Sequence, residues 1–179
     1  MKQLTLLFIP LLFVGCQKLK PESVSIPEYP DFAELMKDQV ELLGEGKIEK
    51  QVMLGDEQET QFIMMDSTRW VEELSFLKEI NPNQPEYVGT FEKSEEGNTQ
   101  TLSLGANESG ALKKVIYAKD EDGYTSIEAT FHEDKDVYIH HREIKLNFEK
   151  GILSSYQING YQKMMMKDTV RFGVELKVD

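Results

Sequence analysis

The chain has 179 residues, of which 32 are acidic and 20 basic, and its formal net charge is −12 at pH 7. This negative excess argues against nucleic-acid binding, because a phosphate backbone would be repelled. The single cysteine excludes a framework of internal disulfide bonds, and the length suits one domain with a sizeable core.

Residues 1–15 are predicted to be a signal peptide. Lys2 supplies a short positive region, Leu4 to Val14 form an apolar run, and Gly15 stands directly before Cys16. A helix of this apolar run would be about 16 Å long, roughly half of a ~30 Å hydrocarbon core, so it is too short to span a membrane.

The segment from Leu12 to Cys16 (Leu-Phe-Val-Gly-Cys) resembles the lipobox of bacterial lipoproteins. In that family the cysteine is acylated and becomes the first residue of the mature chain. Phe13 departs from the usual Leu. The alternative is a secreted protein whose cysteine is incidental, but acylation would explain the single thiol, and several acyl chains anchor a protein durably. Cys16 is therefore the predicted lipidation site, and the membrane is the partner bound through its lipid.

Residues 16–30 are predicted to be the lipidated cysteine and a flexible tether, because they are polar, contain three prolines and show no period. Gln17 is not the Asp that retains enterobacterial lipoproteins at the inner membrane, and this resemblance favours the outer membrane. Residues 31–179 are predicted to form a single globular domain.

Two helices are predicted at the start of this domain. The first has apolar residues at three-and-four spacing and is followed by Gly44. The second can be capped by Asp66 or Ser67 and is stopped by Asn81-Pro82. The expected buried residues are Phe32, Leu35, Met36, Val40 and Leu43 in the first helix, and Trp70, Leu74 and Leu77 in the second.

A hairpin is predicted from Lys47 to Met65 around Gly55-Asp56-Glu57-Gln58, and a β meander follows Pro85. Alternating apolar and polar residues between turns are typical of antiparallel strands. Asn159-Gly160 could be a further hairpin turn or a glycine bulge. The predicted strands of the meander cover residues 86–93, 99–104, 112–119, 124–132, 137–148, 152–165 and 169–178.

The register of one hairpin can be predicted from its apolar residues. A four-residue loop at 133–136 would pair Phe131 with Tyr138 and would place His141 opposite Glu128. The apolar residues of both strands then share one face. The predicted fold class is α+β, with two N-terminal helices packed on a large, twisted antiparallel sheet of about seven to nine strands.

The sequence also resembles uncharacterised lipoproteins of Bacteroidota. These have a lipobox and an Asp-Ser-x-x-Trp-x-x-Glu-Leu-x-x-x-Lys-Glu helix, followed by Asn-x-Pro and a long β region. Here the helix starts at Asp66-Ser67, its tryptophan is Trp70, and Asn81-Pro82 follows it. The resemblance covers most of the mature chain and implies a fold and a compartment, but no activity or cofactor.

No catalytic or metal site is predicted. His140 and His141 are adjacent on a strand and point to opposite faces, so they cannot bind one ion together. The acidic turns at 120–123 and 133–136 would lie at opposite ends of a strand and lack the calcium-loop spacing. No serine-nucleophile motif or phosphate-binding glycine loop occurs, so no enzyme is expected.

Methionine is the residue type that stands out, with three consecutive residues at 164–166. Its deformable side chain suits core gaps and adaptable binding surfaces alike. The candidates for an apolar ligand or partner surface are Met53, Met64, Trp70, Met164 and Met166.

Three classes of function stay open. A non-catalytic interaction or structural domain of an envelope lipoprotein predicts an exposed apolar patch or a free sheet edge. A carrier or sensor of a small, lipid-like ligand between sheet and helices predicts a closed cavity lined by methionine and aromatic side chains. An enzyme predicts converging polar groups with perturbed pKa values, which the sequence does not offer.

Overall fold

The computed structural model describes residues 28–178, which form an α+β structure with one nine-stranded antiparallel sheet. The predicted class and the large antiparallel sheet are confirmed. The elements are α1 (Phe32–Leu43), β1 (Gly46–Leu54), β2 (Glu57–Met65), α2 (Ser67–Glu73), α3 (Phe76–Glu79), β3 (Phe91–Glu96), β4 (Thr99–Leu104), β5 (Leu112–Asp120), β6 (Gly123–Lys135), β7 (Tyr138–Glu149), β8 (Ile152–Met164) and β9 (Val170–Val178).

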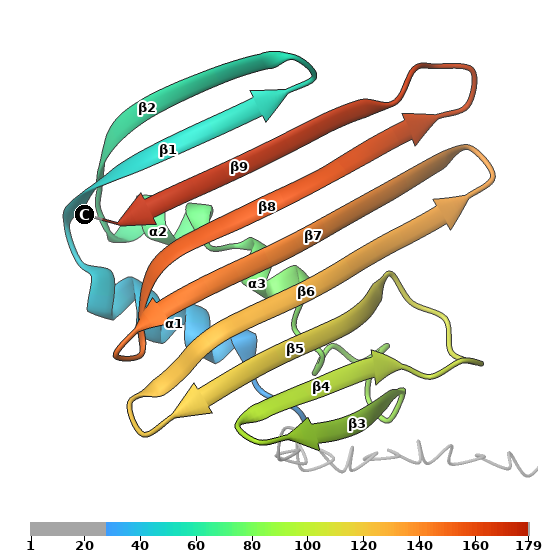
Figure 1. Cartoon of the computed structure of the whole chain (residues 1–179), viewed down its shortest axis with the longest axis horizontal. Coiled ribbons are helices and arrows are strands. Elements are labelled where there is room, and N and C mark those ends of the chain that lie inside the picture. The colour runs from blue at the N-terminus through green and yellow to red at the C-terminus, as the bar shows by residue number, and fades with distance from the viewer. Residues whose placement is uncertain (1–27, 179) are drawn as a thin grey trace, which may run out of the picture.

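The strand order is β2-β1-β9-β8-β7-β6-β5-β4-β3, so the seven strands of the meander are consecutive neighbours (Figure 1). The predicted hairpin β1–β2 joins the meander through β9, which pairs Lys50 of β1 with Leu176. The hairpin ends β1–β2, β6–β7 and β8–β9 lie at the same end of the sheet (Figure 1). The helices lie behind the sheet in this view, and the face toward the viewer carries no helix.

Helix α1 is fixed at its start and along its buried face. The Asp31 side chain accepts hydrogen bonds from the backbone N–H groups of Ala33 and Glu34, which satisfies two donors of the first turn. Gln39, whose side chain is buried, donates to the carbonyl of Gly151 at 2.9 Å and accepts from the N–H of Leu153 at 2.7 Å. The amide thus joins α1 to the turn between β7 and β8.

The predicted second helix is in fact two short helices, which corrects the prediction of one continuous helix. Asp66 caps α2 as predicted, by accepting from the N–H of Arg69. The break at Leu74-Ser75 changes the direction of the chain and brings Phe76 to a ring-centroid distance of 5.2 Å from Tyr156 on β8. Phe76 and Leu77 are both buried after this break.

The core lies between the helices and the sheet. Trp70, Leu74 and Ile80 are fully buried on the helical side, and apolar residues from most strands meet them. Tyr29 is also buried and contacts Phe91, although it falls in the segment predicted to be tether. The fully buried residues of the sheet include Ile48, Leu112, Ile127, Leu146 and Leu176.

The predicted register of the β6–β7 hairpin is wrong by four residues. The turn consists only of Asp136 and Val137, because Lys135 pairs with Tyr138. Phe131 therefore pairs with Arg142, and His141 pairs with His132 instead of Glu128. A shift of four is even, so every side chain stays on the predicted face of the sheet.

Asn159-Gly160 is neither a hairpin turn nor a bulge. Both residues continue the regular pairing of β8, with Asn159 opposite Glu143 and Gly160 opposite Arg142. A Cβ at position 160 would overlap the ring of Phe172 and a backbone oxygen, so glycine here makes room for an aromatic ring. The pairing of β8 is irregular at Ser154 instead. Asn147 pairs with Ser155 and Phe148 with Leu153, so Ser154 has no partner in the register.

The first strand of the meander also starts later than predicted. Residues 86–90 form turns, in which the N–H of Thr90 bonds to the carbonyl of Tyr87 at 3.1 Å. The Tyr87 hydroxyl accepts from the N–H of Leu112 at 3.1 Å, so this segment covers the start of β5 instead of pairing as a strand.

Candidate interaction surface at the strand ends

The residues predicted for a ligand or partner surface lie in three different places. Trp70 is fully buried, and its indole N–H donates to the carbonyl of Gly44 at 3.0 Å. Met53 and Met64 are exposed on the helix-free face of β1 and β2. Met164 and Met166 lie at the end of β8 and in the turn that follows it. The structure therefore brings only Met164 and Met166 together.

Exposed apolar side chains gather where the hairpins β6–β7 and β8–β9 end. A backbone hydrogen bond of 2.9 Å from the N–H of Met165 to the carbonyl of Val137 joins the two turns. The side chain of Met166 is 98% exposed, and the exposed fractions of Val137, Met164, Met165 and Val170 lie between 45% and 61%. We call this surface the apolar tip, and it consists of Val137, Met164, Met165, Met166 and Val170.

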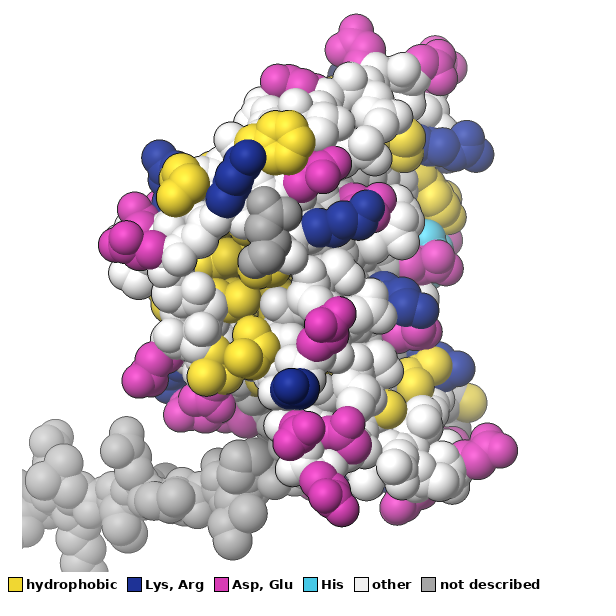
Figure 2. All heavy atoms as spheres, turned by 60° about the vertical axis from the view of Figure 1, so that its left-hand side comes forward, with side chains coloured by type: hydrophobic (Ala, Val, Ile, Leu, Met, Phe, Trp, Pro, Cys, Tyr) yellow, Lys and Arg dark blue, Asp and Glu magenta, His cyan; other side chains and the backbone are white. Residues whose placement is uncertain are grey.

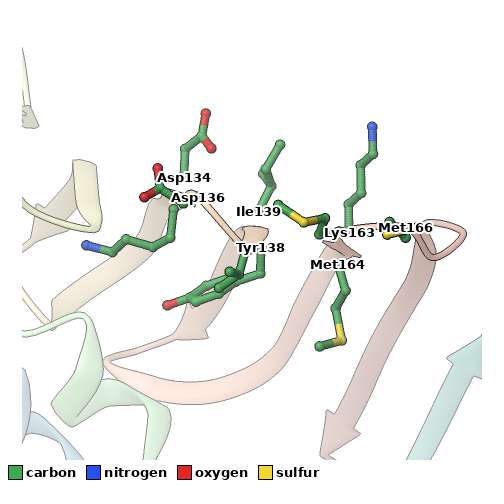
Figure 3. A pocket seen from close by; sticks show the side chains of 10 residues that line it. Asp134, Asp136, Tyr138, Ile139, Lys163, Met164 and Met166 are labelled. Atoms are coloured by element: carbon green, nitrogen blue, oxygen red, sulfur yellow. The ribbon is translucent and has the colours of Figure 1, made fainter.

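Both sides of the sheet contribute side chains at the tip (Figure 3). Tyr138 pairs with Met164, and their side chains point to one side. Ile139 pairs with Lys163, and these point to the other side. Residues 134–139 and 163–166 line an open hollow of about 370 Å³. The hollow is wide and unenclosed, so it suits contact with a surface better than enclosure of a small molecule.

The backbone of the turn holds Met166 in an unfavourable conformation. Its φ is +61°, in the left-handed region that non-glycine residues rarely adopt. A residue in this region carries backbone strain, and strain of this kind is enriched at functional sites. Here the strained residue carries a side chain that is almost fully exposed.

The charges of the tip differ from those of the whole chain. Residues 134–137 and 163–171 contain four basic and three acidic side chains, whereas the chain has 20 basic and 32 acidic residues. Beside the tip, the Tyr138 hydroxyl donates to Glu133 at 2.6 Å, which lowers the pKa of the Glu133 carboxyl and raises the pKa of Tyr138. The tip therefore lacks the negative excess of the protein.

The strand segment behind the tip is tied to the helical layer. Arg142 donates to Glu79 of α3 at 2.7 Å and lies 4.5 Å from the ring centroid of Phe131. His140 contacts Phe131 and Phe172, and burial, followed by the nearby Arg142, lowers its pKa. These contacts give the tip a rigid base.

A second hollow lies between α2, α3 and the sheet, with a volume of about 420 Å³. Lys50 and Glu73 form an ion pair in it, with Lys50 Nζ 2.7 Å from both carboxylate oxygens, and the Tyr156 hydroxyl donates to the same carboxylate. Burial, then the charge of Glu73, raises the pKa of Tyr156. Ile63, Phe76, Ile158 and Val174 supply the apolar part of the wall.

The two sheet edges differ in how they are protected. Edge strand β3 has six residues, four of them charged, which discourages pairing with another strand. Edge strand β2 has nine residues and is charged only at Glu57 and Glu59. Its other half exposes Phe62 and Met64, each 63% exposed. Figure 2 views the molecule from the β2 side and shows apolar side chains among scattered charged ones.

Two of the three histidines and a tyrosine form a row across the helix-free face. His141 lies between His132 and Tyr161, at ring-centroid distances of 5.6 and 5.3 Å. His140 points to the other face, as predicted. Within residues 28–178, no group of three or more histidine, cysteine or acidic side chains is arranged to hold a metal ion.

No protein-family model matches the chain, and no curated protein matches it. Within the described part of the chain, no helix is both long and apolar enough to cross a membrane. The predicted signal peptide and Cys16 lie outside the described residues.

Sequence reasoning missed Val137 and Val170. Met164 and Met166 were singled out because three methionines are consecutive. Nothing in the sequence indicated that Val137, about thirty residues away, would lie beside them, because that contact depends on the register of two hairpins.

Proposed function

We propose that the protein is a lipid-anchored lipoprotein of the bacterial cell envelope, held in the outer membrane through Cys16, and that its domain is a non-catalytic interaction domain. The observation that carries this proposal is the apolar tip, because an exposed cluster of large apolar side chains is costly unless a partner covers it. The helices between residues 32 and 79, packed on the sheet, serve in this proposal as the rigid base of the domain.

The distribution of methionine supports an interaction domain over a ligand carrier. A carrier was expected to have a closed cavity lined by methionine and aromatic side chains. Among the described methionines only Met36 and Met65 are buried, and the three at the tip are exposed. The apolar atoms are thus displayed toward the surroundings.

The second candidate function is a carrier of a small apolar ligand, and the hollow between α2, α3 and the sheet favours it. Its volume of about 420 Å³ falls in the range of ligand sites. Phe76 and Ile158 could contact an apolar group there, while Arg69 and Glu72 border the same hollow.

Native mass spectrometry of residues 17–179 separates the two candidates. We expect the mass of the chain alone, because the apolar tip is a docking surface and the hollow stays empty through purification. A co-purified apolar molecule bound in a one-to-one ratio, and lost in a Val174→Arg variant that fills the hollow, would contradict the interaction proposal and establish a carrier.

A further inference from the structure

We propose that the apolar tip inserts its side chains into the surface of the lipid bilayer that carries the protein's own anchor. This inference rests on the proposed function and names the partner of the same surface. Three observations support it: the composition of the tip, its charge, and its distance from the point where the tether enters the domain.

The tip has the composition of a shallow membrane contact. Its five apolar side chains stand on two adjacent turns, and Lys163 and Lys167 flank the methionines. Burial of such side chains away from water is favourable, so several together can hold a protein against a membrane. Lysine can bury its aliphatic stem and keep its ammonium group among the head groups.

The charge of the tip sets how it can approach a bilayer. The surface of the whole chain is acidic and is repelled by anionic head groups. The segments that carry the tip, residues 134–137 and 163–171, have four basic and three acidic residues and lack this repulsion. Asp134, Asp136 and Asp168 stand beside the apolar residues and oppose deep burial, so the contact stays at the level of the head groups.

The position of the tether allows the lipid and the tip to meet one bilayer. The described chain starts beside β3, where the Glu28 carbonyl accepts from Lys93 at 3.0 Å. The row of paired residues that starts at Lys93 crosses five strand spacings, about 24 Å, and reaches Ile158 on β8. Met164 lies six residues, about 20 Å, farther along that strand, so the separation is about 31 Å. Residues 17–27 could span about 40 Å if extended, which exceeds the resulting separation.

A membrane explains the tip better than a protein partner does. The tip is built from hairpin ends, whereas a partner strand would use the free edge β2. Its three consecutive methionines and the strained, 98% exposed Met166 offer side-chain insertion without any requirement for shape complementarity.

The test uses the full-length, lipidated protein reconstituted into phosphatidylethanolamine–phosphatidylglycerol vesicles. Cys16 is the only native cysteine, so a Met165→Cys variant offers one free thiol for an environment-sensitive fluorophore once Cys16 is acylated. The matched control is Thr101→Cys on the helix-free face of β4. We expect a blue-shifted emission at position 165, quenching by lipid-borne nitroxides, and protection from aqueous iodide. The label at position 101 should show none of these.

The outcomes separate this inference from the proposed function. If the label at position 165 is open to iodide in pure lipid vesicles but protected in native envelope vesicles, the partner is a protein and the membrane inference is overturned while the proposed function stands. Concentration-dependent self-quenching would indicate a second copy of the chain and would overturn it in the same way. A label open to iodide in both kinds of vesicle would overturn both proposals.

Discussion

A Trp70→Ala variant is expected to lose about 3–5 kcal/mol of free energy of unfolding. The side chain is fully buried where α2 meets the rest of the core, and its truncation leaves a cavity that α1 and the sheet cannot close. The measurement is urea unfolding followed by far-ultraviolet circular dichroism, because the variant lacks the only tryptophan.

Two further variants make the Trp70 result specific. Trp70→Phe keeps most of the ring volume and loses the hydrogen bond to the carbonyl of Gly44, so a smaller loss of about 1–2 kcal/mol is expected. Val71→Ala changes an exposed neighbour on the same helix and should alter stability by less than about 0.5 kcal/mol. Equal losses for Trp70→Ala and Val71→Ala would contradict the packing described for α2.

A Glu73→Ala variant should lose about 2–4 kcal/mol, because it leaves the Lys50 ammonium and the Tyr156 hydroxyl without their partner in a largely buried site. Glu72 lies on the same helix and is exposed, so the Glu72→Ala variant is the matched control. Chemical denaturation of both variants, at pH 7 and constant salt, gives the comparison.

The Lys50–Glu73 pair can also be tested as a unit. Replacing both residues in a Lys50→Met, Glu73→Leu variant should restore much of the stability that the Glu73→Ala change removes, because no unpaired charge is left inside. The single variants Lys50→Met and Glu73→Leu are measured beside it. If the loss of unfolding free energy in the double variant equals the sum of the two single losses, Lys50 and Glu73 do not interact in the way their 2.7 Å contact implies.

The sequence predicted the α+β class, the β1–β2 hairpin and the approximate position of most meander strands, because those features depend on local periodicity and on turn residues such as Gly55 and Gly97. The two-residue turn at Asp136-Val137 was not predicted, since valine has no turn preference and Asp136 is only one of several charged residues in this stretch. The charged residues 133–136 predict a loop at that place, and this accounts for the error of four residues in the register.

Other errors arose from contacts between residues far apart in the sequence. Asn159-Gly160 is predicted to be a turn or a bulge. Only the ring of Phe172, opposite Gly160 on β9, explains why a glycine is needed inside a regular strand. The break between α2 and α3 likewise depends on the burial of Phe76 against Tyr156. The sequence prediction named only Met164 and Met166 of the apolar tip for the same reason, since Val137 joins Met165 only once two hairpins are in register.

The most direct test of the tip as a docking surface is photocrosslinking in intact cells. A photoreactive amino acid at position 165 should form crosslinks to envelope lipid or protein, and the same residue at position 101, on the helix-free face, should form few. Crosslinks at the tip that vanish when Met164 and Met166 are both replaced by Ser would support the account. Equal crosslinking at positions 165 and 101, or none at 165, would contradict it.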